Sequence, residues 1–110
     1  MEPSVVIYTE YVNASLLEEV LFSLSKQVRT SRDGKVWEFV INNDWYQLTI
    51  DEASLDVMRE DLSKKEVTET GPFYALSLSS NAKEAGNHLQ MDQLINLIEN
   101  VLPVYGVART

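Results

Sequence analysis

The chain has 110 residues, of which 45% are hydrophobic, and it carries a formal net charge of −8. This length predicts one domain with a single core, and the hydrophobic content is too high for a disordered chain. A sequence without cysteine excludes disulfides, thiolate zinc sites and cysteine nucleophiles. So acidic a surface disfavours nucleic acids and anionic membranes and favours basic partners, unless the charge serves solubility alone.

The N-terminal part predicts a strand followed by a helix. Residues Val5–Tyr11 alternate between two apolar faces, which indicates an inner position in a sheet. Asn13 or Ser15 then caps a helix that runs to about Val28. Apolar residues at helical spacing mark the face of this helix that packs on the core, namely Leu16, Leu17, Val20, Leu21, Leu24 and Val28.

A basic cluster surrounds the link Thr30–Lys35. Its members are Lys26, Arg29, Arg32 and Lys35. One interpretation is a small site for an anion or a partner, and the other is a helix C-terminus followed by a solvated loop. No aromatic residue is interleaved with these cations, so we favour the loop and expect no binding of nucleic acid.

Two strands with a tight turn between them form the predicted centre of the sheet. They are Val36–Ile41 and Trp45–Ile50, and Asn42-Asn43-Asp44 suits a short hairpin turn because Asn and Asp tolerate positive φ. Alternation gives each strand one strongly apolar face and one mixed face, as expected for a sheet with two amphipathic helices on one side. The strongly apolar faces carry Trp37, Phe39, Ile41, Tyr46, Leu48 and Ile50.

Trp45 lies on the mixed face, at the end of its strand. We favour packing in the core or at its rim, because aromatic side chains dominate small cores. The alternative is a recognition aromatic.

The segment Asp51–Lys65 predicts a short helix in the most acidic region of the chain. Leu55, Met58 and Leu62 have helical spacing, and Asp51 or Ser54 supplies the cap. Glu52 with Asp56, and Asp56 with Glu60, are four residues apart and would share one helical face. A face of carboxylates binds a cation or a basic partner, although a solvated face above an apolar one is the more common case.

The C-terminal part predicts a loop at Glu66–Pro72, a strand at Phe73–Ser80, a polar loop at Asn81–Asn87 and a helix at Met91–Leu102. In the strand, the larger side chains Tyr74, Leu76 and Leu78 face the core, and the small ones Ala75, Ser77 and Ser79 face an open side. Pro103 ends or kinks the last helix. The tail then adds a short edge strand at Val104–Val107 or frays.

This order of elements predicts an α+β fold, a two-layer sandwich of a mainly antiparallel sheet with helices on one face. If residues 51–65 are helical, the core matches a ferredoxin-like plait with an added C-terminal helix. If they are not, the chain is a β-α-β-β-β-α variant with a meander of three strands.

The sequence offers little for catalysis. His88, the only histidine, stands in a polar segment with no evident nucleophile or orienting partner. One histidine and no cysteine exclude a histidine-rich or thiolate metal site, and no phosphate-binding or nucleophile-elbow motif occurs. We expect no enzyme and no cofactor. A hydrolase or transferase would need two carboxylates that face each other in a pocket.

The leading hypothesis is a non-enzymatic interaction domain with an acidic surface for a basic protein partner. The predicted partner-binding residues are Asp51, Glu52, Asp56, Glu60, Asp61 and Trp45. In size, acidity and exposed aromatics the chain resembles bacterial toxin-immunity proteins; a nuclease inhibitor or a secretion-type chaperone would fit.

The alternative hypothesis is a small-molecule-binding or regulatory domain that forms a homodimer through its sheet, with Trp45, Thr49, Ser77 and Ser79 on an open face. The N-terminus lacks the basic and apolar regions of a signal peptide, and Leu16–Leu24 is too short to span a bilayer. We therefore expect a cytoplasmic protein that does not bind membranes.

Overall fold

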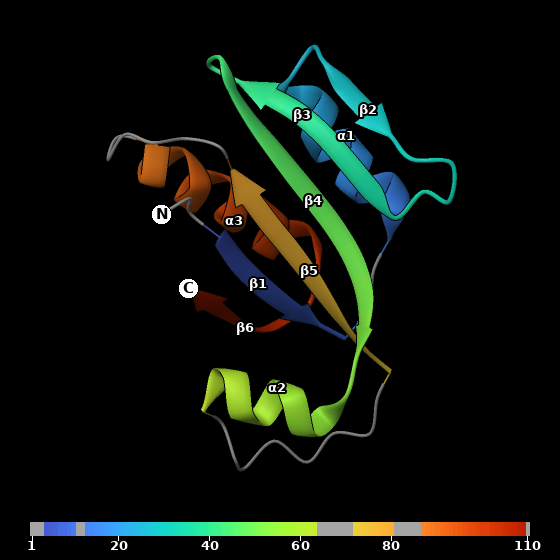
Figure 1. Cartoon of the computed structure of the whole chain (residues 1–110), viewed down its shortest axis with the longest axis vertical. Helices are drawn as coiled ribbons and strands as arrows, with labels where there is room; N and C mark the ends of the chain where they lie inside the picture. Colours follow the sequence, from blue (N-terminus) through green and yellow to red (C-terminus); the bar gives the residue numbers. More distant parts are fainter. Residues whose placement is uncertain (1–3, 11–12, 64–71, 81–86, 110) are drawn as a thin grey trace.

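A computed structural model describes residues 4–10, 13–63, 72–80 and 87–109 of the chain (Figure 1). Within these ranges the chain forms six strands and three helices. In chain order they are β1 (Ser4–Thr9), α1 (Ala14–Leu24), β2 (Val28–Thr30), β3 (Val36–Ile41), β4 (Asp44–Ala53), α2 (Leu55–Leu62), β5 (Phe73–Ser80), α3 (Asn87–Val101) and β6 (Val104–Arg109).

The strands form one antiparallel sheet in the order β2-β3-β4-β5-β1-β6. This arrangement confirms the predicted two-layer α+β class and the inner position of β1. The ferredoxin-like plait is not confirmed, because β5 separates β4 from β1. The strands β3, β4 and β5 are instead neighbours in chain order, as in the meander variant, although a helix lies between β4 and β5.

The hairpin of β3 and β4 stands in the middle of the sheet, as predicted. Ile41 pairs with Asp44, so the turn has two central residues. These are Asn42 with φ 50° and Asn43 with φ 70°, the left-handed conformation that a two-residue hairpin requires and that asparagine tolerates. The turn fixes the register, and the register places Trp37, Phe39, Ile41, Tyr46, Leu48 and Ile50 on one face and Trp45 with the smaller Val36 and Val40 on the other.

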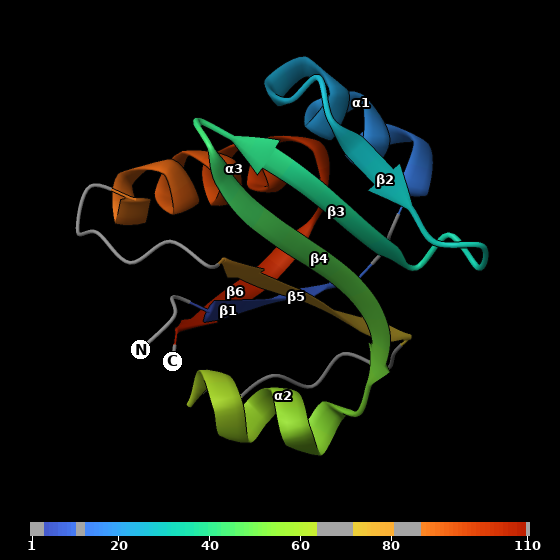
Figure 2. The same cartoon turned by 45° about the horizontal axis from the view of Figure 1, so that its top comes forward.

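The main core lies between this face of the sheet and the helices α1 and α3, which cover it together (Figure 2). The fully buried residues Trp37, Phe39 and Leu48 form its centre. The rings of Phe39 and Tyr46 stack at a centroid distance of 5.5 Å. The indole nitrogen of Trp37 donates a hydrogen bond of 3.2 Å to Glu18 on α1, which ties this helix to the hairpin.

A second, smaller core lies on the opposite face, where α2 covers one end of the sheet (Figures 1 and 2). The prediction that the helices share one face is therefore right for α1 and α3 and wrong for α2. Met58 of α2 is fully buried there against Tyr8, Phe73 and Ala108. The ring of Tyr105 meets that of Phe73 edge-on at 5.4 Å. Among the residues that the structure describes, α2 is the helix on this second face, and it covers one end of it.

The first helix ends earlier than predicted. Asn13 caps it as expected, with its side chain accepting a hydrogen bond from the amide of Leu16 at 3.2 Å. The helix stops at Leu24 because Ser25 is extended and its hydroxyl oxygen accepts bonds from the amides of Gln27 and Val40. The prediction that the first helix extends to about Val28 is therefore wrong. Val28 and Arg29 belong to β2.

The strand β4 is longer than predicted. It pairs with β5 from Tyr46 to Ala53, so Asp51 and Glu52 lie on a strand and not on a helix. The carboxylates of Glu52 and Asp56 therefore do not share a helical face. The tail forms β6, as one of the two alternatives predicted, and α3 begins at Asn87, before the predicted start.

Two further predictions fall on segments without a described structure. The loop Glu66–Pro72 lies outside the described residues except for Pro72, and so does the loop at 81–87 except for Asn87. Of the helices in the described ranges, none has both the length and the apolar character that a bilayer span demands.

Candidate functional site

The predicted partner-binding residues divide between two places. Asp51 and Glu52 lie at the end of β4, and Asp56, Glu60 and Asp61 lie on α2, which follows it. Trp45 stands near the other end of β4. Seven residues at about 3.3 Å each separate Trp45 from Glu52, a path of roughly 23 Å along the strand. The predicted set is therefore not one site.

The helix α2 begins and ends at defined caps. The hydroxyl of Ser54 accepts a hydrogen bond of 3.3 Å from the amide of Val57 at the N-terminus. Ser63 ends the helix in the left-handed conformation, with its amide bonded to the carbonyl of Glu60 at 3.3 Å. A helix of eight residues is marginal in isolation. Its position therefore depends on what holds it against the sheet.

Two contacts hold α2 on the sheet. The first is the burial of Met58 in the second core. The second is a hydrogen bond of 2.5 Å that the hydroxyl of Tyr8 on β1 donates to the carboxylate of Asp61. Burial, with the bond to Asp61 and its negative charge, raises the pKa of Tyr8 to about 12. Asp61 therefore helps to anchor the helix, and its carboxylate is at the same time exposed.

The outer face of α2 combines charge with an exposed apolar side chain. Asp56 and Glu60 are exposed and stand four residues apart, on one side of the helix. Val57 lies between them in the chain and is 54% exposed. Asp51 and Glu52 are exposed at the adjoining end of β4. Because side chains alternate along a strand, Glu52 lies on the main-core face with Ile50, whereas Asp51 lies with Ala53 on the face that α2 covers. We call Asp51, Asp56, Val57 and Glu60 the acidic surface.

The composition of the acidic surface suits a protein partner. A carboxylate rim attracts basic side chains over a distance, and an apolar centre adds affinity once water is displaced. The carboxylates are exposed to solvent. Arg59, which is half-buried, is the cation of α2 among the described residues.

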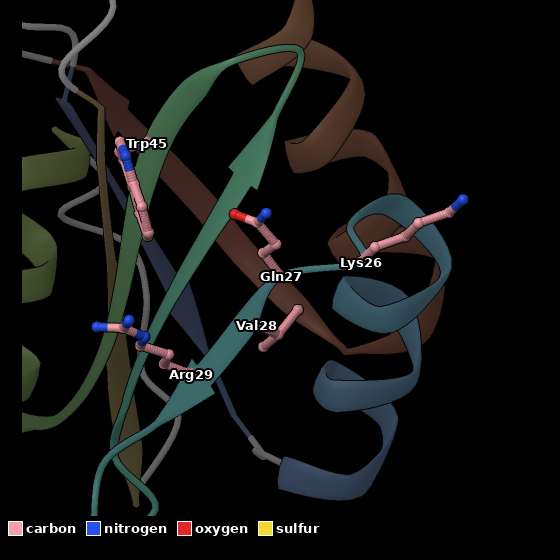
Figure 3. Close-up of a pocket in the computed structure, with 5 residues that line it drawn as sticks. All are labelled: Lys26, Gln27, Val28, Arg29 and Trp45. Atoms are coloured by element: carbon pink, nitrogen blue, oxygen red, sulfur yellow. The ribbon is translucent and has the colours of Figure 1, made fainter.

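Trp45 borders a hollow at the opposite end of the second sheet face (Figure 3). The hollow has a volume of about 420 Å³ and is lined by Lys26, Gln27, Val28, Arg29 and Trp45. Trp45 is 41% exposed, so part of its side chain packs on the sheet and part of it is accessible to solvent. A second hollow of about 220 Å³ lies beside β2, and Arg29 lines both hollows.

Sequence reasoning named the cations of this region but did not connect them with Trp45. Arg29 was assigned to a helix terminus, and Gln27 was not singled out at all. The connection runs through β2, a strand of only three residues that brings Arg29 onto the sheet beside β3. The alternation of polar and apolar residues in Gln27-Val28-Arg29 is the signal that a short strand was available.

The sheet face between these two places carries the residues that the alternative hypothesis assigns to a ligand or a dimer contact, and that assignment stays a prediction. Thr49, Ser77 and Ser79 are half-buried on it and lie in facing pairs across β4 and β5. His88 belongs to the first turn of α3 and not to a loop, but its side chain lies outside the described residues. Within the described ranges, no group of three or more His, Cys, Asp or Glu residues is placed to hold a metal ion.

Comparison with known proteins adds no constraint. Neither the models of protein families nor the sequences of curated proteins match this chain.

Proposed function

We propose that this protein is a non-enzymatic interaction domain that binds a basic protein partner through its acidic surface. The observation that carries the proposal is the exposed Val57 on α2 among the carboxylates of Asp56 and Glu60. Burial of Val57 against a partner would add apolar area to a contact that the neighbouring carboxylates orient by charge.

The net charge of −8 supports the same class of partner. Such a field accelerates the encounter with a positively charged protein and repels polyanions. An inhibitor of a basic enzyme, of the kind that immunity proteins provide, or a chaperone for a basic client would both use such a surface. The proposal places this activity in the cytoplasm. A chain without cysteine needs no disulfide and is therefore compatible with a reducing compartment.

The attachment of α2 gives the surface its rigidity. Because Met58 and the Tyr8–Asp61 bond fix the helix, Val57, Asp56 and Glu60 keep their positions before a partner arrives. A surface that is ordered beforehand loses less conformational entropy on binding.

The experiment compares three immobilised forms of the protein as baits in a lysate of the native organism. They are the wild type, the double variant Asp56→Asn/Glu60→Gln and the control Glu19→Gln/Glu99→Gln, which removes the same number of charges from exposed positions on α1 and α3. Asp61 is left intact because of its bond to Tyr8.

We expect the wild type and the control to retain the same protein at low salt and the double variant to lose it. The retained protein should be basic and should elute as the salt concentration rises, since exposed charge pairs are screened. Equal retention by the two double variants would refute the role of the acidic surface.

A further inference from the structure

The hollow beside Trp45 has features that the acidic surface lacks. Its volume of about 420 Å³ falls in the range of small-molecule sites, and an exposed indole ring borders it. Residues 26–29 supply the rest of its lining. It lies at the far end of β4 from the acidic surface and shares no residue with it.

The side chains around the hollow differ in their direction. In Figure 3 the guanidinium of Arg29 and the amide of Gln27 extend to the side of the sheet where the ring of Trp45 stands. The ammonium of Lys26 points away from that ring, and Val28 turns towards the main core. Arg29 and Gln27 are therefore the polar groups that meet Trp45 across the hollow.

The register explains this arrangement. Arg29 pairs with Glu38, and Trp45 pairs with Val40, which is two residues from Glu38 on the same face of β3. The guanidinium and the indole ring thus belong to neighbouring rows of one sheet face. Glu38 is the carboxylate that faces Arg29 in the register, and it is exposed.

The segment 26–35, which supplies two lining cations of the hollow, Lys26 and Arg29, is opposite in charge to the rest of the chain. Residues 26–35 contain four of the nine Lys and Arg residues and one carboxylate, Asp33, which gives a local charge of +3. Subtracting +3 from the total of −8 leaves −11 for the remaining residues. The carboxylate of Asp33 accepts bonds from the hydroxyl of Ser31 and the amide of Lys35, and so is committed to the turn.

We propose that this hollow binds a small planar aromatic molecule that carries an anionic group. The aromatic ring lies against the indole of Trp45, and the anion bonds to the guanidinium of Arg29, whose planar donors suit carboxylate and phosphate. Gln27 offers an amide for a further polar group. The charge of −11 on the remaining residues repels a long polyanion, so the ligand is a single small molecule.

This inference does not depend on the proposed function, because the two sites have no residue in common. Carboxylate and phosphate share the chemistry that Arg29 recognises, and two probes distinguish them. Adenosine monophosphate carries a phosphate on an aromatic base, and indole-3-acetate carries a carboxylate on an aromatic ring. Inorganic phosphate and adenosine are the controls, because each contains only one of the two groups that adenosine monophosphate combines.

The measurement is a titration of tryptophan fluorescence, repeated by calorimetry. Trp37 is fully buried, so quenching by a bound ligand reports on Trp45. The test variant is Arg29→Gln, and the control is Arg32→Gln, which removes the same charge from an exposed position outside the lining of the hollow. Arg29 is itself exposed, so neither substitution disturbs the core.

We expect saturable binding of at least one complete probe, weakened about tenfold or more by Arg29→Gln and changed less than about twofold by Arg32→Gln. Binding of adenosine monophosphate alone assigns the anion as phosphate, and binding of indole-3-acetate alone assigns it as carboxylate. Equal weakening by both variants, or binding of inorganic phosphate as tight as that of adenosine monophosphate, would overturn the proposal. Failure of all probes to saturate would do the same.

Discussion

The attachment of α2 can be tested by the truncation Met58→Ala. Met58 is fully buried in the second core, and the substitution removes its side chain beyond Cβ. At about 0.8 kcal/mol for each group of methylene size, the lost transfer free energy is about 2.4 kcal/mol. The cavity that remains brings the cost to about 2–4 kcal/mol, a large part of the roughly 5–15 kcal/mol that stabilises a domain of this size.

The matched control is Val57→Ala on the adjoining residue. Val57 is 54% exposed, so its truncation should cost less than about 0.5 kcal/mol. The assay is urea unfolding followed by far-ultraviolet circular dichroism, with amide hydrogen exchange to locate the effect. In the Met58→Ala variant the amides of α2 should exchange faster while those of β3 and β4 stay protected, because the main core contains no residue of α2. Equal midpoints for the two variants would refute the idea that Met58 holds the helix.

Two other predictions concern pH. Because the pKa of Tyr8 is about 12 in the folded chain against 10.0 as its ordinary value, its contribution to stability is complete below pH 10 and is lost as the pH rises towards 12. Tyr8→Phe should reduce this loss of stability in urea unfolding, with a remainder from Tyr46, whose pKa burial also raises; an unchanged pH profile would contradict the assignment. The bonds from Ser31 and from the amide of Lys35 lower the pKa of Asp33, so Ser31→Ala should raise it towards 3.8 in an NMR titration, and an unmoved midpoint would show that the hydroxyl does not matter.

The parts of the fold that follow from local patterns were predictable. The bounds of β3 and β5 agree with the sequence prediction at both ends, because each strand is a run of apolar or alternating residues between turn signals. The turn at Asn42-Asn43 and the cap at Asn13 follow from side chains that act on their own backbone. The alternation of faces in β3, β4 and β5 was predicted correctly for the same reason, since it depends on nothing distant. The prediction that Ala75 faces an open side was wrong, because Ala75 packs against the second core.

The errors arise where a distant contact decides the local structure. The end of α1 depends on the bond from the amide of Val40 to Ser25, and 15 residues separate the two in the chain. The continuation of β4 through Asp51 and Glu52 depends on its pairing with β5. Local preference for helix in an acidic segment could not reveal either contact.

For both candidate sites, the sequence predicted which charged residues are present but not which of them lie together. Asp56 and Glu60 share a helix face as expected, since their spacing is local. The bond between Asp61 and Tyr8, and the position of Arg29 and Trp45 on one sheet face, both depend on the order of strands. Strand order is a property of the whole chain, and the pattern of one segment does not contain it.

The place of β1 in the sheet has a consequence for how the chain folds. This strand comes first in the sequence, yet both of its neighbours, β5 and β6, lie beyond residue 72. On the ribosome β3 and β4 can pair as soon as they emerge, whereas β1 must wait for most of the chain. Contacts so distant in sequence form slowly. Until they form, β1 exposes two apolar faces and two open edges, and premature association with other chains is therefore most probable there.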